Sequence, residues 1–156
     1  MTTLSAERVV PRPPAEVFRF VATEHFANHP KWDPDVLEMV PTAPGPMGVG
    51  STARVVRRQG RGRAEGIATV TAYEPDRLAA FYVRFGPFAL LQRVECLPEQ
   101  DGAATRLRLT IETRAKGPVA VLVPLMRGRF RATMERSLAT IAELLTGVTP
   151  GRSAST

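Results

Sequence analysis

Residues 118–145, PVAVLVPLMRGRFRATMERSLATIAELL, determine which fold the rest of the chain can adopt. At about 100° per residue, seven side chains between Met126 and Leu145, among them Ser137, fall within about a third of the helical circumference, and four charged ones, Arg131, Glu135, Arg136 and Glu143, lie elsewhere. This pattern predicts one long amphipathic C-terminal helix that starts near residue 118. Its apolar face begins with large, adaptable side chains and ends with close-packing ones: Met126, Phe130 and Met134, then Leu138, Ile141 and Leu145.

The segments before this helix alternate between apolar and polar side chains, as half-buried strands do. A first strand is followed by two short helical segments and then by about six further strands. An antiparallel sheet with one apolar face has to cover that face, and only the last helix is long enough. We therefore predict an α+β fold: a curved antiparallel sheet of about six to seven strands wraps around the C-terminal helix and leaves a space near its Met and Phe side chains. The predicted strands are residues 4–10, 36–40, 50–58, 64–74, 78–85, 88–97 and 105–114.

Composition narrows the possible functions. The 156-residue chain has one cysteine, Cys96, and two histidines, which are too few for a Cys/His metal site, so we expect neither metal nor cofactor. The net charge is +6, with 19 arginines against 2 lysines, but no stacking aromatic residues are interleaved with them. We therefore expect no nucleic-acid partner. The arginine preference is typical of a GC-rich bacterial genome.

No apolar run is long enough for a signal peptide or a membrane span. We expect a cytoplasmic protein without stable membrane insertion, either a monomer or a homodimer. A single domain should occupy residues 1–146, and the tail at 147–156 should be disordered.

Five motifs follow one another along the chain: PPAEVFRFV (13–21), HPKWDPDV (29–36), GVGS (48–51), VTAYEPDRL (70–78) and the final stretch from Gly117. In this order and spacing, they resemble the SRPBCC superfamily. Within it, they are similar to the polyketide cyclase/dehydrase and lipid-transport group, which is related to START domains and the birch pollen allergen. The resemblance covers about residues 4–146 and implies a helix-grip fold with an internal apolar cavity. It implies no reaction, because members include carriers, cyclases and hormone receptors without a shared catalytic set.

Four polar residues on two neighbouring predicted strands are candidates for chemistry: Tyr82, Arg84, Arg93 and Glu95. On the concave face of the sheet, the arginines could bind a carboxylate or polarise a carbonyl, and Glu95 could act as an acid or base. On the convex face, the same residues would form a cross-strand ion-pair ladder of small energetic value. The ladder is the preferred interpretation, because the alternate residues of the first strand are more apolar: Phe81, Val83 and Phe85.

A second group of polar residues precedes the second strand. His25 and His29 with Asp33 could form a base with an orienting carboxylate, but Pro30 should break the helix, which favours exposed loop histidines. Trp32 is either a gate at the cavity mouth or a lid residue packed on the core. Tyr73 is expected to share a face with Ile67, where its hydroxyl would be a polar anchor.

The preferred hypothesis is that the protein binds a small hydrophobic molecule: a lipid, a polyketide or an aromatic compound. The alternative is a polyketide cyclase or dehydratase, which would need at least two polar candidates inside the cavity, from Tyr73, Arg84, Arg93, Glu95, His25 and His29. An interaction domain with a collapsed cavity remains a third possibility. The predicted ligand-binding residues are Trp32, Tyr73, Phe81, Phe85, Met126, Phe130 and Met134.

Overall fold

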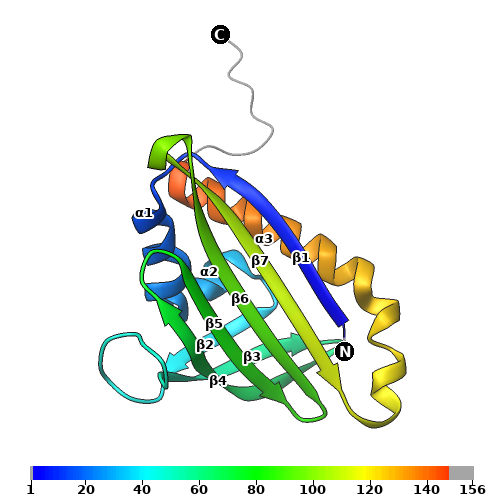
Figure 1. Cartoon of the computed structure of the whole chain (residues 1–156). Coiled ribbons are helices and arrows are strands. Elements are labelled where there is room, and N and C mark those ends of the chain that lie inside the picture. The colour runs from blue at the N-terminus through cyan, green and yellow to red at the C-terminus, as the bar shows by residue number, and fades with distance from the viewer. Residues whose placement is uncertain (1, 148–156) are drawn as a thin grey trace.

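The computed structural model describes residues 2–147, in which one antiparallel sheet curves around a long C-terminal helix (Figure 1). Its seven strands pair in the order β1-β7-β6-β5-β4-β3-β2, so that the first two strands of the chain form the two edges. The strands are β1 (Thr2–Val10), β2 (Val36–Pro41), β3 (Thr52–Gln59), β4 (Gly62–Glu74), β5 (Leu78–Phe85), β6 (Phe88–Glu99) and β7 (Ala104–Ala115).

The helices follow the strands in the order that the α+β prediction gave, which confirms the fold class. Two short helices, α1 (Pro14–Phe18) and α2 (His25–Trp32), follow β1, and a π-helical turn joins them. The long helix α3 (Arg127–Thr146) ends at Gly147, whose φ of 71° suits a residue without a side chain. The remainder of the tail predicted to be disordered, residues 148–156, lies outside the described residues.

Alternation along the strands separates a buried concave face from a polar convex one. In β7, Leu107 and Leu109 are buried, whereas Arg106 and Arg108 point to the opposite side. The helices lie on one side of the sheet (Figure 1), and the core fills the space between. The largest fully buried apolar side chains are Phe18, Phe81, Leu107, Leu109, Leu138 and Ile141.

A β-bulge in β4 reverses the alternation within that strand. The pairing with β5 shifts between Val70 and Ala72, because one extra residue on β4 has no opposite partner. Ile67 is therefore 48 % exposed, whereas Tyr73 packs against the core. The expectation that Ile67 and Tyr73 share a face is wrong, because strict alternation does not continue through a bulge.

The final helix begins later than the sequence pattern predicted. Residues 117–126 form two separate 3-10 turns, Gly117–Val121 and Pro124–Met126, and α3 starts at Arg127. Proline lacks the N–H that helix continuation requires, and its ring disfavours helical geometry in the residue before it. Pro118 and Pro124 therefore divide the segment that hydrophobic periodicity alone had joined.

By contrast, Pro30 does not break α2. The helix runs through it to Trp32, and the Asp33 N–H donates to the His29 carbonyl oxygen at 3.0 Å. The proline lies in the second half of an eight-residue helix, where it removes a single backbone hydrogen bond. Both histidines are therefore held on a helix and buried, and the preference for exposed loop histidines is wrong.

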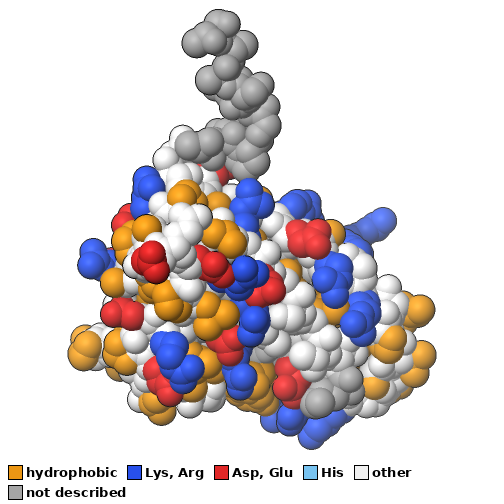
Figure 2. All heavy atoms as spheres, turned by 45° about the horizontal axis from the view of Figure 1, so that its top comes forward, with side chains coloured by type: hydrophobic (Ala, Val, Ile, Leu, Met, Phe, Trp, Pro, Cys, Tyr) orange, Lys and Arg blue, Asp and Glu red, His pale blue; other side chains and the backbone are white. Residues whose placement is uncertain are grey.

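Within the described part of the chain, no helix combines the length and apolar character that crossing a bilayer requires. Basic and acidic side chains are interspersed on the face of the molecule that Figure 2 presents. The positive net charge is thus not gathered into one large basic patch on that face.

Candidate ligand-binding cavity

A cavity of about 440 Å³ lies between the concave face of the sheet and the first half of α3. Strands β2 to β7 contribute its floor, and the end of α2 contributes one wall. Its apolar lining consists mainly of Trp32, Val36, Met39, Val55, Val83, Phe85, Phe88, Leu90, Leu109, Ile111, Met126, Phe130 and Met134.

Five of the seven predicted ligand-binding residues line this cavity together. Trp32 comes from α2, Phe85 from β5, and Met126, Phe130 and Met134 from the C-terminal segment. The cavity is also lined by Phe88, Leu90 and Ile111, which are not among the predicted residues, although the alternation within β6 and β7 places them on the buried face.

The other two predicted residues lie elsewhere in the core. Phe81 is 1 % exposed and lies beneath the ring of His25, so it does not line the cavity. The Tyr73 hydroxyl lies 2.9 Å from the Thr23 hydroxyl, and its ring meets Phe18 edge-on at 5.4 Å between centroids. Tyr73 therefore links β4 to the π-helical turn and is absent from the lining of the cavity.

The polar residues predicted on β5 and β6 lie on the convex face. Tyr82 and Arg84 are exposed and alternate with the concave Phe81, Val83 and Phe85. Arg84 therefore does not reach the cavity, as it would have done from the concave face. The Arg84 side chain donates to the Gly86 carbonyl oxygen at 3.4 Å, and none of the four polar residues lines the cavity.

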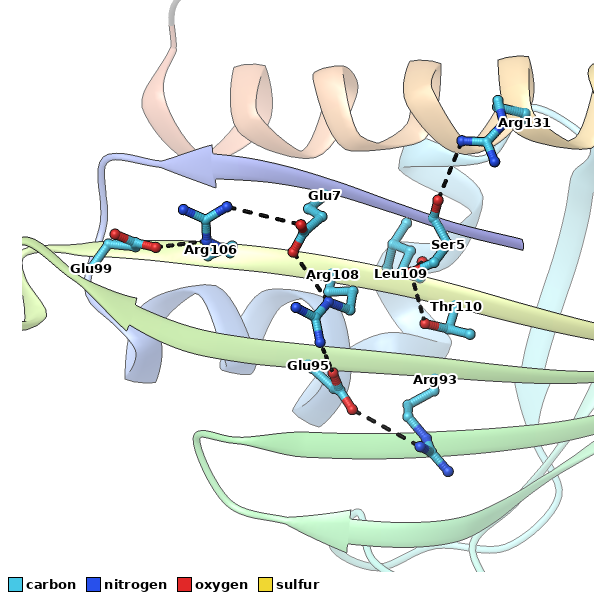
Figure 3. A network of polar contacts seen from close by, with 10 residues as sticks. All are labelled: Ser5, Glu7, Arg93, Glu95, Glu99, Arg106, Arg108, Leu109, Thr110 and Arg131. Atoms are coloured by element: carbon cyan, nitrogen blue, oxygen red, sulfur yellow. Dashed lines mark hydrogen bonds and ion pairs between the residues drawn. The ribbon is translucent and has the colours of Figure 1, made fainter. Parts of the chain in front are cut away.

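A ladder of ion pairs crosses this convex face from β6 to β1 (Figure 3). Glu95 lies 4.0 Å from Arg93 and 3.3 Å from Arg108. Arg108 in turn lies 3.1 Å from Glu7 on β1, and Arg106 extends the ladder to Glu99. Arg93 and Glu95 thus engage each other and their neighbours on the surface.

A histidine–carboxylate pair lies in the cavity wall at the end of α2. His29 Nε2 and Asp33 Oδ2 are 3.5 Å apart, because a spacing of four residues brings them to one side of the last helical turn. Arg57 of β3 approaches the same carboxylate oxygen at 3.3 Å. All three residues line the cavity, and His29 and Asp33 are buried.

The environment of this pair favours a neutral imidazole beside an ionised carboxylate. Burial lowers the pKa of His29 from its ordinary value, and this effect outweighs the contact with Asp33. Burial alone would raise the pKa of Asp33, but the His29 contact, the charge of Arg57 and the Asp35 N–H together lower that pKa to about 2. The tautomer of a neutral His29 that suits this contact has its proton on Nε2, facing the carboxylate.

Two nitrogen atoms in this wall lack hydrogen-bond partners among residues 2–147. They are His29 Nδ1 and Trp32 Nε1, and the two rings lie 4.3 Å apart between centroids. An unsatisfied buried polar atom costs roughly 1–3 kcal/mol. A neutral His29 with its proton on Nε2 has a lone pair on Nδ1, so this atom can accept a proton.

The other cavity and the other polar residues provide fewer groups that could take part in a reaction. His25 does not line the main cavity, and its Nδ1 donates to the Val21 carbonyl oxygen at 2.9 Å. A second hollow of about 490 Å³ lies at the surface between residues 23–27 and the Pro/Gly loop at 41–52. Among the described residues, no three His, Cys, Asp or Glu side chains are grouped closely enough to hold a metal ion.

The fold and cavity together define a helix-grip domain, in which a curved sheet encloses a long helix and an apolar space. The chain belongs to the polyketide cyclase/dehydrase and lipid transport family, whose model matches residues 1–146. No curated protein matches the sequence.

Solved structures of the same fold include a protein from Thermus thermophilus, TTHA0849, with a TM-score of 0.74 and 20 % identity over 94 % of this chain and 98 % of that chain. The Zhui aromatase/cyclase from Streptomyces sp. R1128 has a TM-score of 0.72 and 13 % identity over 92 % of this chain and 93 % of that chain. Ara h 8.0201 has a TM-score of 0.71 and 14 % identity over 94 % and 99 %. At these identities the likeness concerns the fold alone.

Proposed function

We propose that this protein binds a small hydrophobic ligand, such as a lipid, a polyketide or an aromatic compound, between the sheet and α3. The cavity itself carries the proposal. Its volume of about 440 Å³ falls within the roughly 300–1,000 Å³ of small-molecule sites, which are mostly apolar with a few polar groups. The family description, which includes lipid transport, is consistent with this function.

Native mass spectrometry of the protein purified from its own host tests the proposal. A bound mass should accompany the wild-type protein and be absent from Met126→Trp, because the indole would occupy the cavity. Leu125→Trp is the matched control: the neighbouring side chain is 79 % exposed and does not line the cavity. This variant should retain the bound mass.

Binding of a neutral apolar fluorescent probe, N-phenyl-1-naphthylamine, gives a second readout that does not depend on a resident ligand. Met126→Trp should reduce probe binding, and Leu125→Trp should not. Equal probe binding by the wild-type protein and both folded variants would contradict a ligand site at this cavity.

The histidine–carboxylate pair supports a second candidate function, a cyclase or dehydratase acting on a polyketide-like carbonyl compound. His29 Nδ1 would take a proton from the carbon between two carbonyl groups, the electron pair would remain on the substrate as an enolate, and Asp33 would stabilise the imidazolium. Of the six polar candidates for such an enzyme, His29 alone lines the cavity, one fewer than the two that this alternative requires, so Asp33 would have to serve as the second polar group. Their positions outside it argue against catalytic roles for Arg84, Arg93 and Glu95.

Turnover of a poly-β-ketone thioester analogue tests the second function. His29→Gln should lower turnover by about 10²-fold or more if His29 is the general base, while probe binding persists. Glu95→Gln on the convex face is the control and should leave turnover unchanged. Equal turnover by the wild-type protein and His29→Gln would exclude this role for His29.

We further propose that the ligand is bound in the cytoplasm by a monomer or a homodimer. Size-exclusion chromatography with light scattering across a range of protein concentrations distinguishes these two states. A larger assembly would contradict the proposal.

A further inference from the structure

The mouth of the cavity carries an excess of arginine side chains. Among the lining residues, Arg58 of β3 and Arg129 and Arg136 of α3 are exposed, so they lie where the cavity opens to solvent. None of the three has an ion-pair partner within the described residues, in contrast to Arg57, which is paired with Asp33. We call Arg58, Arg129 and Arg136 the arginine rim.

Among residues 2–147, the only acidic side chain that lines the cavity besides Asp33 is Asp35. Asp35 has no ion-pair partner in the described part of the chain, and its carbonyl oxygen accepts the Arg58 N–H at 2.7 Å. One carboxylate can offset only one of the three rim arginines. The mouth therefore keeps a net positive charge above an apolar interior.

The position of the rim on α3 follows from helical geometry. At about 100° per residue, Arg129 and Arg136 lie on one edge of the apolar face that Phe130 presents to the cavity. Arg127 and Arg131 lie on the opposite edge, where Arg131 donates to the Ser5 carbonyl oxygen of β1 at 3.4 Å. Neither Arg127 nor Arg131 lines the cavity.

We propose that the ligand is an anionic amphiphile, whose carboxylate or phosphate head group binds the arginine rim while its apolar body occupies the cavity. This inference rests on the proposed function and adds the charge of the ligand to it. Guanidinium groups pair with such oxyanions through charge-assisted hydrogen bonds. Phe85 and Phe130, which line the interior, would contact the apolar body.

Matched twelve-carbon amphiphiles test the inference when binding is measured by calorimetry below the micelle concentrations of the ionic compounds and below the solubility limit of dodecanol. Dodecanoate and dodecyl phosphate should bind more tightly than dodecanol, and dodecyltrimethylammonium should bind most weakly. Arg129→Gln/Arg136→Gln should weaken dodecanoate binding by about five- to tenfold, since exposed charge contacts are individually modest. The same variant should leave the dodecanol affinity unchanged.

Arg127→Gln/Arg131→Gln is the matched control. It removes the same charge from the same helix but outside the cavity, so dodecanoate should bind as it does to the wild-type protein. Raising the salt concentration from about 0.01 M to about 1 M shortens the screening length from about 30 Å to about 3 Å. The preference for dodecanoate over dodecanol should shrink accordingly.

The outcomes separate the two proposals. Equal binding of dodecanoate and dodecanol, or equal losses in the rim and control variants, would overturn the anionic head group but leave a hydrophobic ligand in place. If no amphiphile binds and Met126→Trp leaves probe binding unchanged, the cavity is not a ligand site, and both proposals fail.

Discussion

His25 lies flat against Phe81, with ring centroids 3.8 Å apart and planes inclined by 13°. The imidazole thus packs as an aromatic ring in the core, and its Nδ1–H satisfies the Val21 carbonyl oxygen. Burial, followed by the neighbouring His29, holds the pKa of His25 well below its ordinary value. The folded protein therefore contains two buried histidines that are neutral at pH 7.

These histidines should make the protein sensitive to acid. Because their pKa values are lowered on folding, the unfolded chain binds more protons below about pH 6.5, and acid favours unfolding. The free energy of unfolding should be constant between about pH 7.5 and pH 8, above which the Cys96 thiol ionises in the unfolded chain. Below about pH 6.5 it should fall, with a limiting slope of about 1.4 kcal/mol per pH unit for each histidine. Urea denaturation at several pH values measures this slope.

His29→Gln provides the control for this pH dependence. The glutamine amide cannot titrate but can still donate to Asp33. The slope of the free energy of unfolding against pH, between about pH 6 and pH 5, should therefore drop by about half. In the wild-type protein, protonation of Asp33, whose folded pKa is about 2, should add a further loss of stability below about pH 4. An unchanged slope in His29→Gln would show that other groups govern the acid sensitivity.

Gly66 should be intolerant of substitution. A Cβ at this position in β4 would overlap the Arg84 carbonyl oxygen of the neighbouring strand and lie 3.1 Å from the Phe85 ring. Gly66→Ala should therefore lower the free energy of unfolding by about 2 kcal/mol or more, since overpacking forces backbone shifts. Gly62→Ala in the same strand is the control, because its nearest contact would be an ordinary 3.8 Å. Similar urea midpoints for the two variants would contradict the close approach of β5 to Gly66.

The ion-pair ladder should contribute little to stability and nothing to binding. Glu95→Gln leaves the hydrogen-bonding shape of the side chain but removes its charge between Arg93 and Arg108. We expect a loss of about 0–1 kcal/mol, because surface pairs are well screened, and an unchanged affinity for the apolar probe. A large loss of probe binding would instead connect the convex face to the cavity.

Cys96 should be unreactive in the folded protein. Burial, with a smaller contribution from the charge of Asp76, raises the pKa of its thiol to about 12, and the thiolate is the reactive form. Ellman's reagent at about pH 8 should modify the thiol only after urea unfolds the chain. Rapid stoichiometric modification in native buffer would indicate that β6 opens locally.

Periodicity was sufficient to predict the fold because most strands alternate without interruption. In β7, the alternation of Leu107 and Leu109 with Arg106 and Arg108 identified the buried face directly. The same rule failed in β4, because the bulge between Val70 and Ala72 depends on pairing with β5. A bulge of this kind is set by contacts between strands, which no single stretch of sequence records.

The candidate site was predictable in its apolar part and not in its polar part. Met126, Phe130 and Met134 form a helical stripe, so their common face was visible in the sequence. Pro30 favours a loop and so hides the place of His29 in the cavity wall, whereas the structure accommodates this proline late in a short helix. The contact of Arg57 with Asp33 joins β3 to the end of α2. The sequence does not pair these two residues, because only the folded sheet brings them together.

The order of the strands has a consequence for protein synthesis. β1 pairs with β7, and the Ser5 hydroxyl contacts the Leu109 carbonyl oxygen, 104 positions away in the chain. At a synthesis rate of about 5–20 residues per second, β7 would be made roughly 5 to 20 s after β1. The nascent chain therefore emerges with an unpaired first strand, and the cavity can close only when β7 and α3 have followed it out.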